Sequence, residues 1–223
     1  MANPFTGMLT PSQIALIFDL DNTLIHTPID FLAVRHQLIN LLQQSGAAAA
    51  PREELLRLSL PELVEIGQRV SPELPARMWA VITQAERQGL ARATIVGHAP
   101  EVLSALRERG YRLALLTNNA RTGIAERLGP LGLDQHFEIT VTRDDVRGLK
   151  PLPDGIHLIL SHLTGVQRAY MVGDAWIDGR AAMAAGVRFI GFGEKQAAVL
   201  DRGVTPWAWI TDLRELLTLD LAD

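Results

Sequence analysis

The chain has 223 residues, a formal net charge of −4, and lysines and arginines scattered along its length, which disfavours nucleic acid as a partner. It has no cysteine, so disulfides, thiolate zinc sites and thiol nucleophiles are excluded. Hydrophobic residues make up 48% and charged residues 21%, which is typical of a globular fold.

The first residues, MANPFTGMLTPSQ, lack the basic stretch and the apolar segment of a signal peptide. No apolar run reaches the length needed to span a bilayer. We therefore expect a soluble, cytoplasmic monomer or homodimer with no membrane partner.

Short apolar runs bounded by polar residues or glycine predict strands buried on both faces of a parallel sheet. These runs are residues 14–18, 113–116, 170–172 and 187–192. Helical patterns cover residues 100–109, 153–163 and 177–185, and Gly110 and Gly186 stand at helix C-terminal cap positions. The alternation predicts an α/β fold with a Rossmann-like parallel sheet.

Residues 26–93 have a different pattern. Amphipathic segments such as FLAVRHQLINLLQQ and PELPARMWAVITQAERQ are separated by prolines, and no strand pattern is convincing. We expect an all-helical insert at 26–93 within a core formed by residues 1–25 and 94–223.

Asp19 and Asp21 follow the first apolar run. Residues i and i+2 of an extended chain point to the same side, and open parallel sheets bind ligands beyond the carboxyl ends of their strands. Two close carboxylates repel each other, and a cation would relieve that repulsion. The pair suits a nucleophile beside a general acid/base at a magnesium site, or alternatively a solvated turn or helix N-cap.

The segment FDLDNTL resembles the first motif, DxDx[TV], of the haloacid dehalogenase-like (HAD) superfamily. Three further segments match that family's motifs in order: LLTNNA with Thr117 and Asn118, GLKPLPDGI with Lys150, and VGDAWID with Asp174 and Asp178. Taken alone, the Thr117–Asn118 pair would be a loop, Lys150 a surface lysine, and Asp174 and Asp178 a helix cap. Four motifs in the family's order are specific for the family. The insert is similar to a C1 helical cap, and the chain most resembles phosphoglycolate-phosphatase-like hydrolases.

The resemblance implies a phosphatase acting on a small phosphorylated metabolite. Asp19 would attack phosphorus and form an aspartyl-phosphate. Asp21 would protonate the leaving oxygen and then activate water. Thr117, Asn118 and Lys150 would hold the phosphate oxygens.

The implied cofactor is Mg²⁺, bound by Asp19, the Asp21 carbonyl and Asp174, with Asp178 orienting the metal shell. The second aspartate, Asp21, favours phosphoryl transfer over dehalogenation, because a dehalogenase needs no acid for its leaving group. Three alternatives stay open: a phosphomutase, a 2-haloacid dehalogenase and a non-catalytic phosphate-binding protein.

Two positions depart from the family's pattern. Asn22 stands where many relatives have glycine, and asparagine tolerates unusual backbone angles. Trp176 either narrows the site or packs at the sheet, and we favour packing. Substrate selection should lie in the insert and in the segment that joins it to the core. Candidate cations there include Arg52, Arg57, Arg69, Arg77 and, just after the first motif, His26. The alternative is that these arginines are solvated surface residues, as most helix arginines are.

Overall fold

A computed structural model describes residues 9–46 and 50–222, so residues 1–8, which belong to the segment read for a signal peptide, lie outside the described residues. Six parallel strands form the main sheet in the order β5-β4-β1-β6-β7-β8. They are β1 (Ile14–Phe18), β4 (Arg112–Leu116), β5 (Ile139–Val141), β6 (Arg168–Gly173), β7 (Arg188–Phe192) and β8 (Ala208–Ile210).

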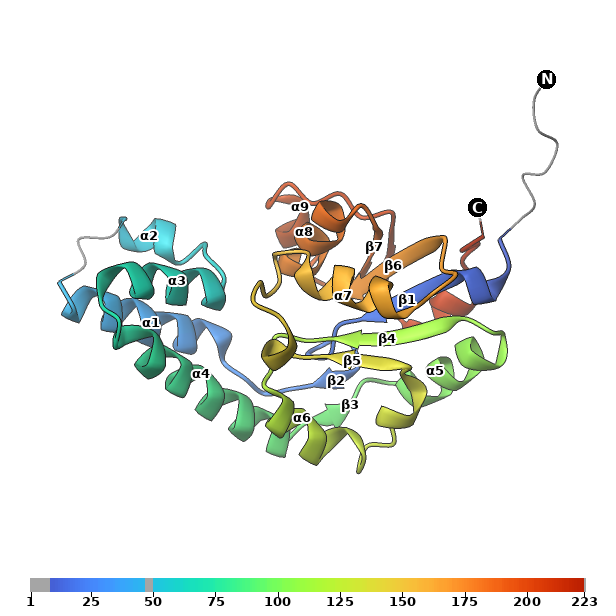
Figure 1. Ribbon diagram of the computed structural model, residues 1–223, viewed down its shortest axis with the longest axis horizontal. Coiled ribbons are helices and arrows are strands. Elements are labelled where there is room, and N and C mark those ends of the chain that lie inside the picture. The colour runs from blue at the N-terminus through green and yellow to red at the C-terminus, as the bar shows by residue number, and fades with distance from the viewer. Residues whose placement is uncertain (1–8, 47–49, 223) are drawn as a thin grey trace, which may run out of the picture.

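β1 lies inside the sheet and has no exposed residue, as its continuous apolar sequence predicts. Alternate β1 side chains enter two separate cores, Leu16 on one face and Ile17 on the other. Helices α5 (Ala99–Glu108) and α6 (Arg121–Leu128) cover the first face. Helices α7 (Asp154–His162), α8 (Trp176–Ala185) and α9 (Gln196–Leu200) cover the second face (Figure 1).

Four more helices form what we call the helical layer (residues 31–91) at one end of the molecule (Figure 1). They are α1 (Phe31–Gln44), α2 (Arg52–Leu55), α3 (Leu60–Val70) and α4 (Leu74–Ala91). The layer has its own apolar core, which includes Leu38, Leu63 and Met78. The antiparallel strands β2 (Ile25–His26) and β3 (Thr94–Ile95) join it to the rest of the chain.

The predicted α/β fold is confirmed, and the predicted helix ends differ from α5, α7 and α8 by one residue. Gly186 has φ +69° at the C-terminal end of α8, and Asn22 has φ +59°, which fits the tolerance of asparagine for this region. Within residues 9–46 and 50–222, no helix is long and apolar enough to cross a membrane.

Candidate active site

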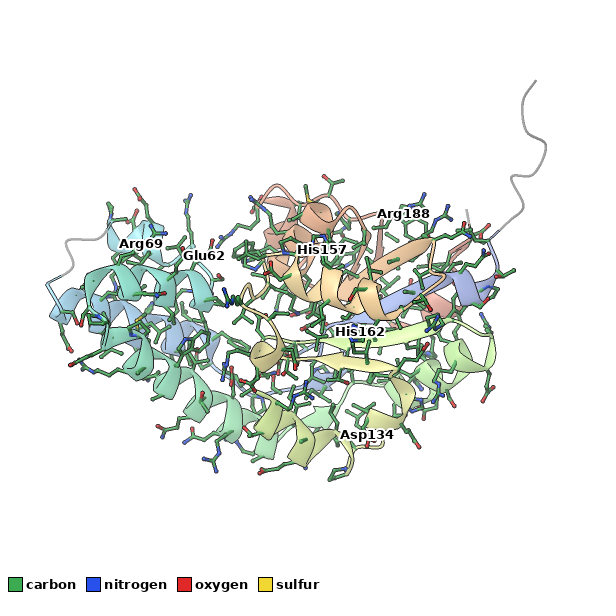
Figure 2. The ribbon with its side chains drawn as sticks, viewed as in Figure 1. Glu62, Arg69, Asp134, His157, His162 and Arg188 are labelled. Atoms are coloured by element: carbon green, nitrogen blue, oxygen red, sulfur yellow. The ribbon has the colours of Figure 1, made fainter. Side chains whose placement is uncertain are left out.

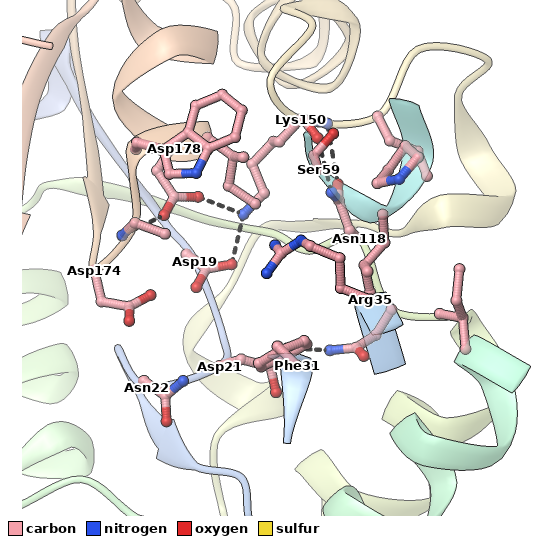
Figure 3. Close-up of a pocket in the computed structure, with 18 of the residues that line it drawn as sticks. Asp19, Asp21, Asn22, Phe31, Arg35, Ser59, Asn118, Lys150, Asp174 and Asp178 are labelled. Carbon is pink, nitrogen blue, oxygen red and sulfur yellow. Dashed lines mark hydrogen bonds and ion pairs between the residues drawn. The ribbon is translucent and has the colours of Figure 1, made fainter. Parts of the chain in front are cut away.

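The predicted site residues gather where the central strands end. Asp19 follows β1, Thr117 follows β4 and Asp174 follows β6, as expected for a parallel sheet. A cavity of about 280 Å³ opens there (Figure 3). Its lining includes Asp19, Lys150 and Asp174 from the sheet end and Phe31, Arg35 and Trp79 from the helical layer.

Lys150 is the buried cation of this site. Its Nζ donates to Asp19 Oδ1 at 2.5 Å and to Asp178 Oδ1 at 2.7 Å, and also to the Leu116 carbonyl at 3.1 Å (Figure 3). Burial opposes the charge on Lys150, but Asp178 and Asp19 outweigh this effect and raise its pKa. The ammonium therefore stays charged and holds the Asp19 carboxylate in place.

Asp178 is held from two sides. Its Oδ2 accepts from the Ala175 backbone N–H at 3.1 Å, while Oδ1 accepts from Lys150. Burial raises the pKa of Asp178 to about 7, against the effect of Lys150 and with Asp19 adding to the rise. Gly173 makes room for this carboxylate, because a Cβ there would lie 2.5 Å from Asp178 Cγ. Gly173 lies within β6 and has no positive φ, so glycine is needed there for space and not for a turn.

Asp21 faces two donors. Thr27 Oγ1 donates to Oδ1 at 2.7 Å, and Asn119 Nδ2 donates to Oδ2 at 2.5 Å. Burial and the neighbouring charge of Asp19 raise the pKa of Asp21 to about 7, although Thr27, Asn119 and Lys150 act in the opposite direction. A carboxyl group with this pKa both donates and accepts protons near neutral pH.

Thr117 and Asn118 are positioned by other residues of the site. Thr117 Oγ1 accepts from Asn119 N at 3.1 Å and from Asn119 Nδ2 at 3.0 Å. The Asn118 amide forms two hydrogen bonds with the Lys150 backbone, donating to its carbonyl at 2.9 Å and accepting from its N–H at 3.0 Å. Asn118 thus fixes the segment that carries Lys150. The expected contacts of Thr117 and Asn118 with phosphate stay predictions.

Asp19, Asp174 and Asp178 form the group that fits a metal ion. One carboxylate oxygen from each lies within 4.8 Å of the others. Carboxylates are hard oxygen donors of the kind that Mg²⁺ and other hard divalent cations prefer. Burial raises the pKa of Asp174, and Lys195 Nζ forms an ion pair with it. The Asp21 carboxylate is outside this group, so its expected metal contact through the carbonyl stays a prediction.

Arg143 links the sheet to the helical layer. It follows β5 and donates to Glu86 Oε1 at 2.7 Å and to Thr83 Oγ1 at 3.0 Å on α4. Its guanidinium carbon lies 4.5 Å from the ring centroid of Trp79. Burial raises the pKa of the Glu86 carboxyl, and Arg143 opposes that rise. Trp79 both packs against the core of the helical layer and lines the cavity.

Trp176 was expected either to narrow the site or to pack at the sheet, and it contributes to both the cavity and the core. It packs against the core on the α7–α9 face of the sheet and lines the cavity, and Arg202 lies 4.8 Å from its ring centroid. None of the candidate insert cations, Arg52, Arg57, Arg69, Arg77 and His26, lines that cavity.

Several site residues were not identified from the sequence. Asn119 follows Thr117 and Asn118 in LLTNNA. Its position just after β4 could have identified it as a site residue. Lys195 follows the end of β7, where the carboxyl-end rule would also have selected it. Thr27 and Arg35 gave no comparable signal, because their roles depend on how the loop after β1 and helix α1 are placed beside the cavity.

Known proteins match this chain over most of its length. The haloacid dehalogenase-like hydrolase family matches residues 16–192. Pyrophosphatase PpaX from Bacillus pumilus is 32% identical over 79% of this chain and 81% of its own. Phosphoglycolate phosphatase from Pectobacterium atrosepticum is 30% identical over 79% of this chain and 78% of its own length. A hydrolase structure from Pseudomonas syringae, 24% identical, covers 92% of this chain and 97% of its own with a TM-score of 0.68, which shows the shared fold. The chain therefore belongs to the haloacid dehalogenase-like hydrolases, as its four motifs predicted.

Proposed function

We propose that this chain is a magnesium-dependent phosphatase that hydrolyses a small phosphate monoester through an aspartyl-phosphate on Asp19. The observation that carries the proposal is that two carboxyl groups at one cavity have different partners. Asp19 is held by Lys150, and Asp21 has a pKa of about 7. Such a division suits a nucleophile and a general acid/base.

In the first step, an Asp19 carboxylate oxygen attacks phosphorus while the bond from phosphorus to the ester oxygen breaks. Protonated Asp21 gives its proton to that departing oxygen, so the product leaves as a neutral alcohol. Lys150 keeps Asp19 oriented and offsets negative charge as the phosphoryl group transfers.

In the second step, Asp21, now ionised, takes a proton from a water molecule that attacks phosphorus. The bond from phosphorus to the Asp19 oxygen breaks, phosphate leaves, and Asp19 and protonated Asp21 are restored. Thr27 and Asn119 keep the Asp21 carboxyl in one orientation through both steps.

Asp19, Asp174 and Asp178 would hold the magnesium ion, which supplies positive charge to the phosphoryl oxygens. The four carboxylates of the site, counting Asp21, face two lysines, Lys150 and Lys195, so a cation would also offset the excess negative charge.

The relatives support a small substrate. One is named a pyrophosphatase and the other a phosphoglycolate phosphatase. In both named substrates the phosphoryl group is attached to a group that carries further negative charge, and the cavity of about 280 Å³ suits a small molecule.

Phosphate release from p-nitrophenyl phosphate tests this function, with magnesium, with EDTA, and with the variant Asp19→Asn. Asp201→Asn, which removes an exposed carboxylate, is the matched control. We expect release that needs magnesium, disappears in Asp19→Asn and persists in the control. Release without an added bisphosphate separates a phosphatase from a phosphomutase. A folded protein that releases no phosphate from any ester in the presence of magnesium contradicts the proposal.

A further inference from the structure

Four cationic side chains line the cavity, and three of them have carboxylate partners. Lys150 pairs with Asp19 and Asp178, Lys195 with Asp174, and Arg143 with Glu86. The fourth is Arg35, on α1. Among the residues that the structure describes, no carboxylate lies within ion-pair distance of Arg35.

Arg35 is directed into the cavity, and its side chain is anchored. Its Nε donates to the Leu58 carbonyl at 3.0 Å, ahead of α3. Figure 3 shows the guanidinium pointing from α1 toward the side of the cavity that holds Asp19 and Lys150. The Nε bond fixes the plane of the guanidinium and leaves its two terminal nitrogens toward the cavity.

The surroundings of Arg35 favour an anion. The side chain is half-buried, and burial together with the nearby charge of Arg202 lowers its pKa. A partly desolvated cation without a counterion is unfavourable, and an arriving anion removes that cost. A guanidinium also presents paired donors that match the oxygens of a carboxylate or a phosphoryl group.

We infer that Arg35 is a specificity-determining residue that binds a second anionic group of the substrate, a carboxylate or a second phosphoryl group, while Asp19 attacks the first phosphoryl group. This inference rests on the proposed phosphatase function. It assigns the substrate class as short phosphate compounds with an anion at the far end, because Arg35 and Asp19 line the same small cavity.

The test compares substrates that have a second anion with one that lacks it. Phosphoglycolate carries a carboxylate where 2-hydroxyethyl phosphate carries a hydroxymethyl group, and inorganic pyrophosphate carries a second phosphoryl group. The value of kcat/KM is measured for each with the wild-type protein and with Arg35→Gln and Arg35→Lys. Arg69→Gln is the matched control, because Arg69 projects from the helical layer with its side chain 74% exposed (Figure 2).

We expect Arg35→Gln to lower kcat/KM by about 10- to 100-fold for a substrate with the second anion, the usual effect of losing a charge-assisted hydrogen bond. The value for 2-hydroxyethyl phosphate should stay within about threefold of the wild-type value. Arg35→Lys should show a smaller loss because it keeps the charge but not the paired donors. Which substrate responds, phosphoglycolate or pyrophosphate, identifies the anion.

Equal losses on all three substrates would show that Arg35 acts on the fold or on the transferred phosphoryl group, and would overturn the inference. An unchanged kcat/KM on every substrate would also overturn the inference. The same holds if the wild-type protein does not prefer either anionic substrate over 2-hydroxyethyl phosphate. The midpoint of thermal unfolding for each variant identifies a folding defect. If the wild-type protein also fails to hydrolyse p-nitrophenyl phosphate, the proposed function itself has failed.

Discussion

Asp21→Asn should make the metal-free protein more stable at alkaline pH while reducing its activity. Asp21 has an ordinary pKa of 3.8 that the fold raises to about 7. Between about pH 4 and 7 the folded protein binds a proton at Asp21 that the unfolded chain has released. The free energy of unfolding therefore falls as pH rises through this window and is flat above it.

The structure sets the size of this effect. A tenfold change in an acid constant corresponds to about 1.4 kcal/mol, so ionised Asp21 costs the folded protein up to about 4 kcal/mol. Water in the cavity reduces this cost, and we expect about 1–4 kcal/mol. Asparagine fits the site because its oxygen accepts from Asn119 and its amide donates to the Thr27 hydroxyl.

Urea unfolding in EDTA at pH 4.5 and pH 8 measures the difference between the two proteins, with Asp201→Asn as the control for lost charge. Asp21→Asn should gain about 1–4 kcal/mol over the wild-type protein at pH 8 and much less at pH 4.5. Its kcat should fall by about 10²- to 10⁴-fold, the usual contribution of a general acid/base. A stability difference that does not depend on pH, or a variant that is less stable at pH 8, would refute this reasoning.

Three further substitutions test the surrounding structure. Lys150→Met leaves Asp178 buried without its cation. Urea unfolding in EDTA should therefore show a loss of about 3–5 kcal/mol in the free energy of unfolding. The same variant should release no phosphate. Gly173→Ala places a Cβ 2.5 Å from Asp178 Cγ and should lower magnesium affinity about 10- to 100-fold by calorimetry; unchanged affinity would contradict the space argument. Arg143→Met should cost about 3 kcal/mol by urea unfolding, whereas Arg69→Met should stay within about 0.5 kcal/mol, and equal costs would contradict a role for burial.

The fold was predictable because its main strands are continuous apolar runs. The run at 14–18 became β1 with the expected limits. The strands β5 and β8 were not predicted, since each has only three residues and such a segment carries too little periodicity to be distinguished from a loop. Both lie at the edges of the sheet, so their absence from the prediction did not change where the site was expected.

The motif residues could be located in the sequence because strand ends meet at one edge of a parallel sheet. Arg35 could not be located in this way, because its proposed role depends on the orientation of α1. The buried residues of α1 are Val34, Leu38, Ile39 and Leu42. At helical spacing, Arg35 lies on the same face as these residues. An arginine on an apolar helix face either extends its charged end to solvent or places it in a cavity, and the sequence of α1 does not distinguish the two.

The site concentrates electrostatic cost at the ends of the central strands. Burial raises the pKa of Asp21, Asp174 and Asp178, so each of them is costly to ionise in the folded protein. Lys150 offsets part of that cost, and a divalent cation would offset more. In the proposed mechanism, the burial that makes Asp21 costly to ionise also gives it a pKa suited to proton transfer near neutral pH. We therefore expect stability and catalysis to oppose each other at Asp21, where one substitution should improve the first and remove the second.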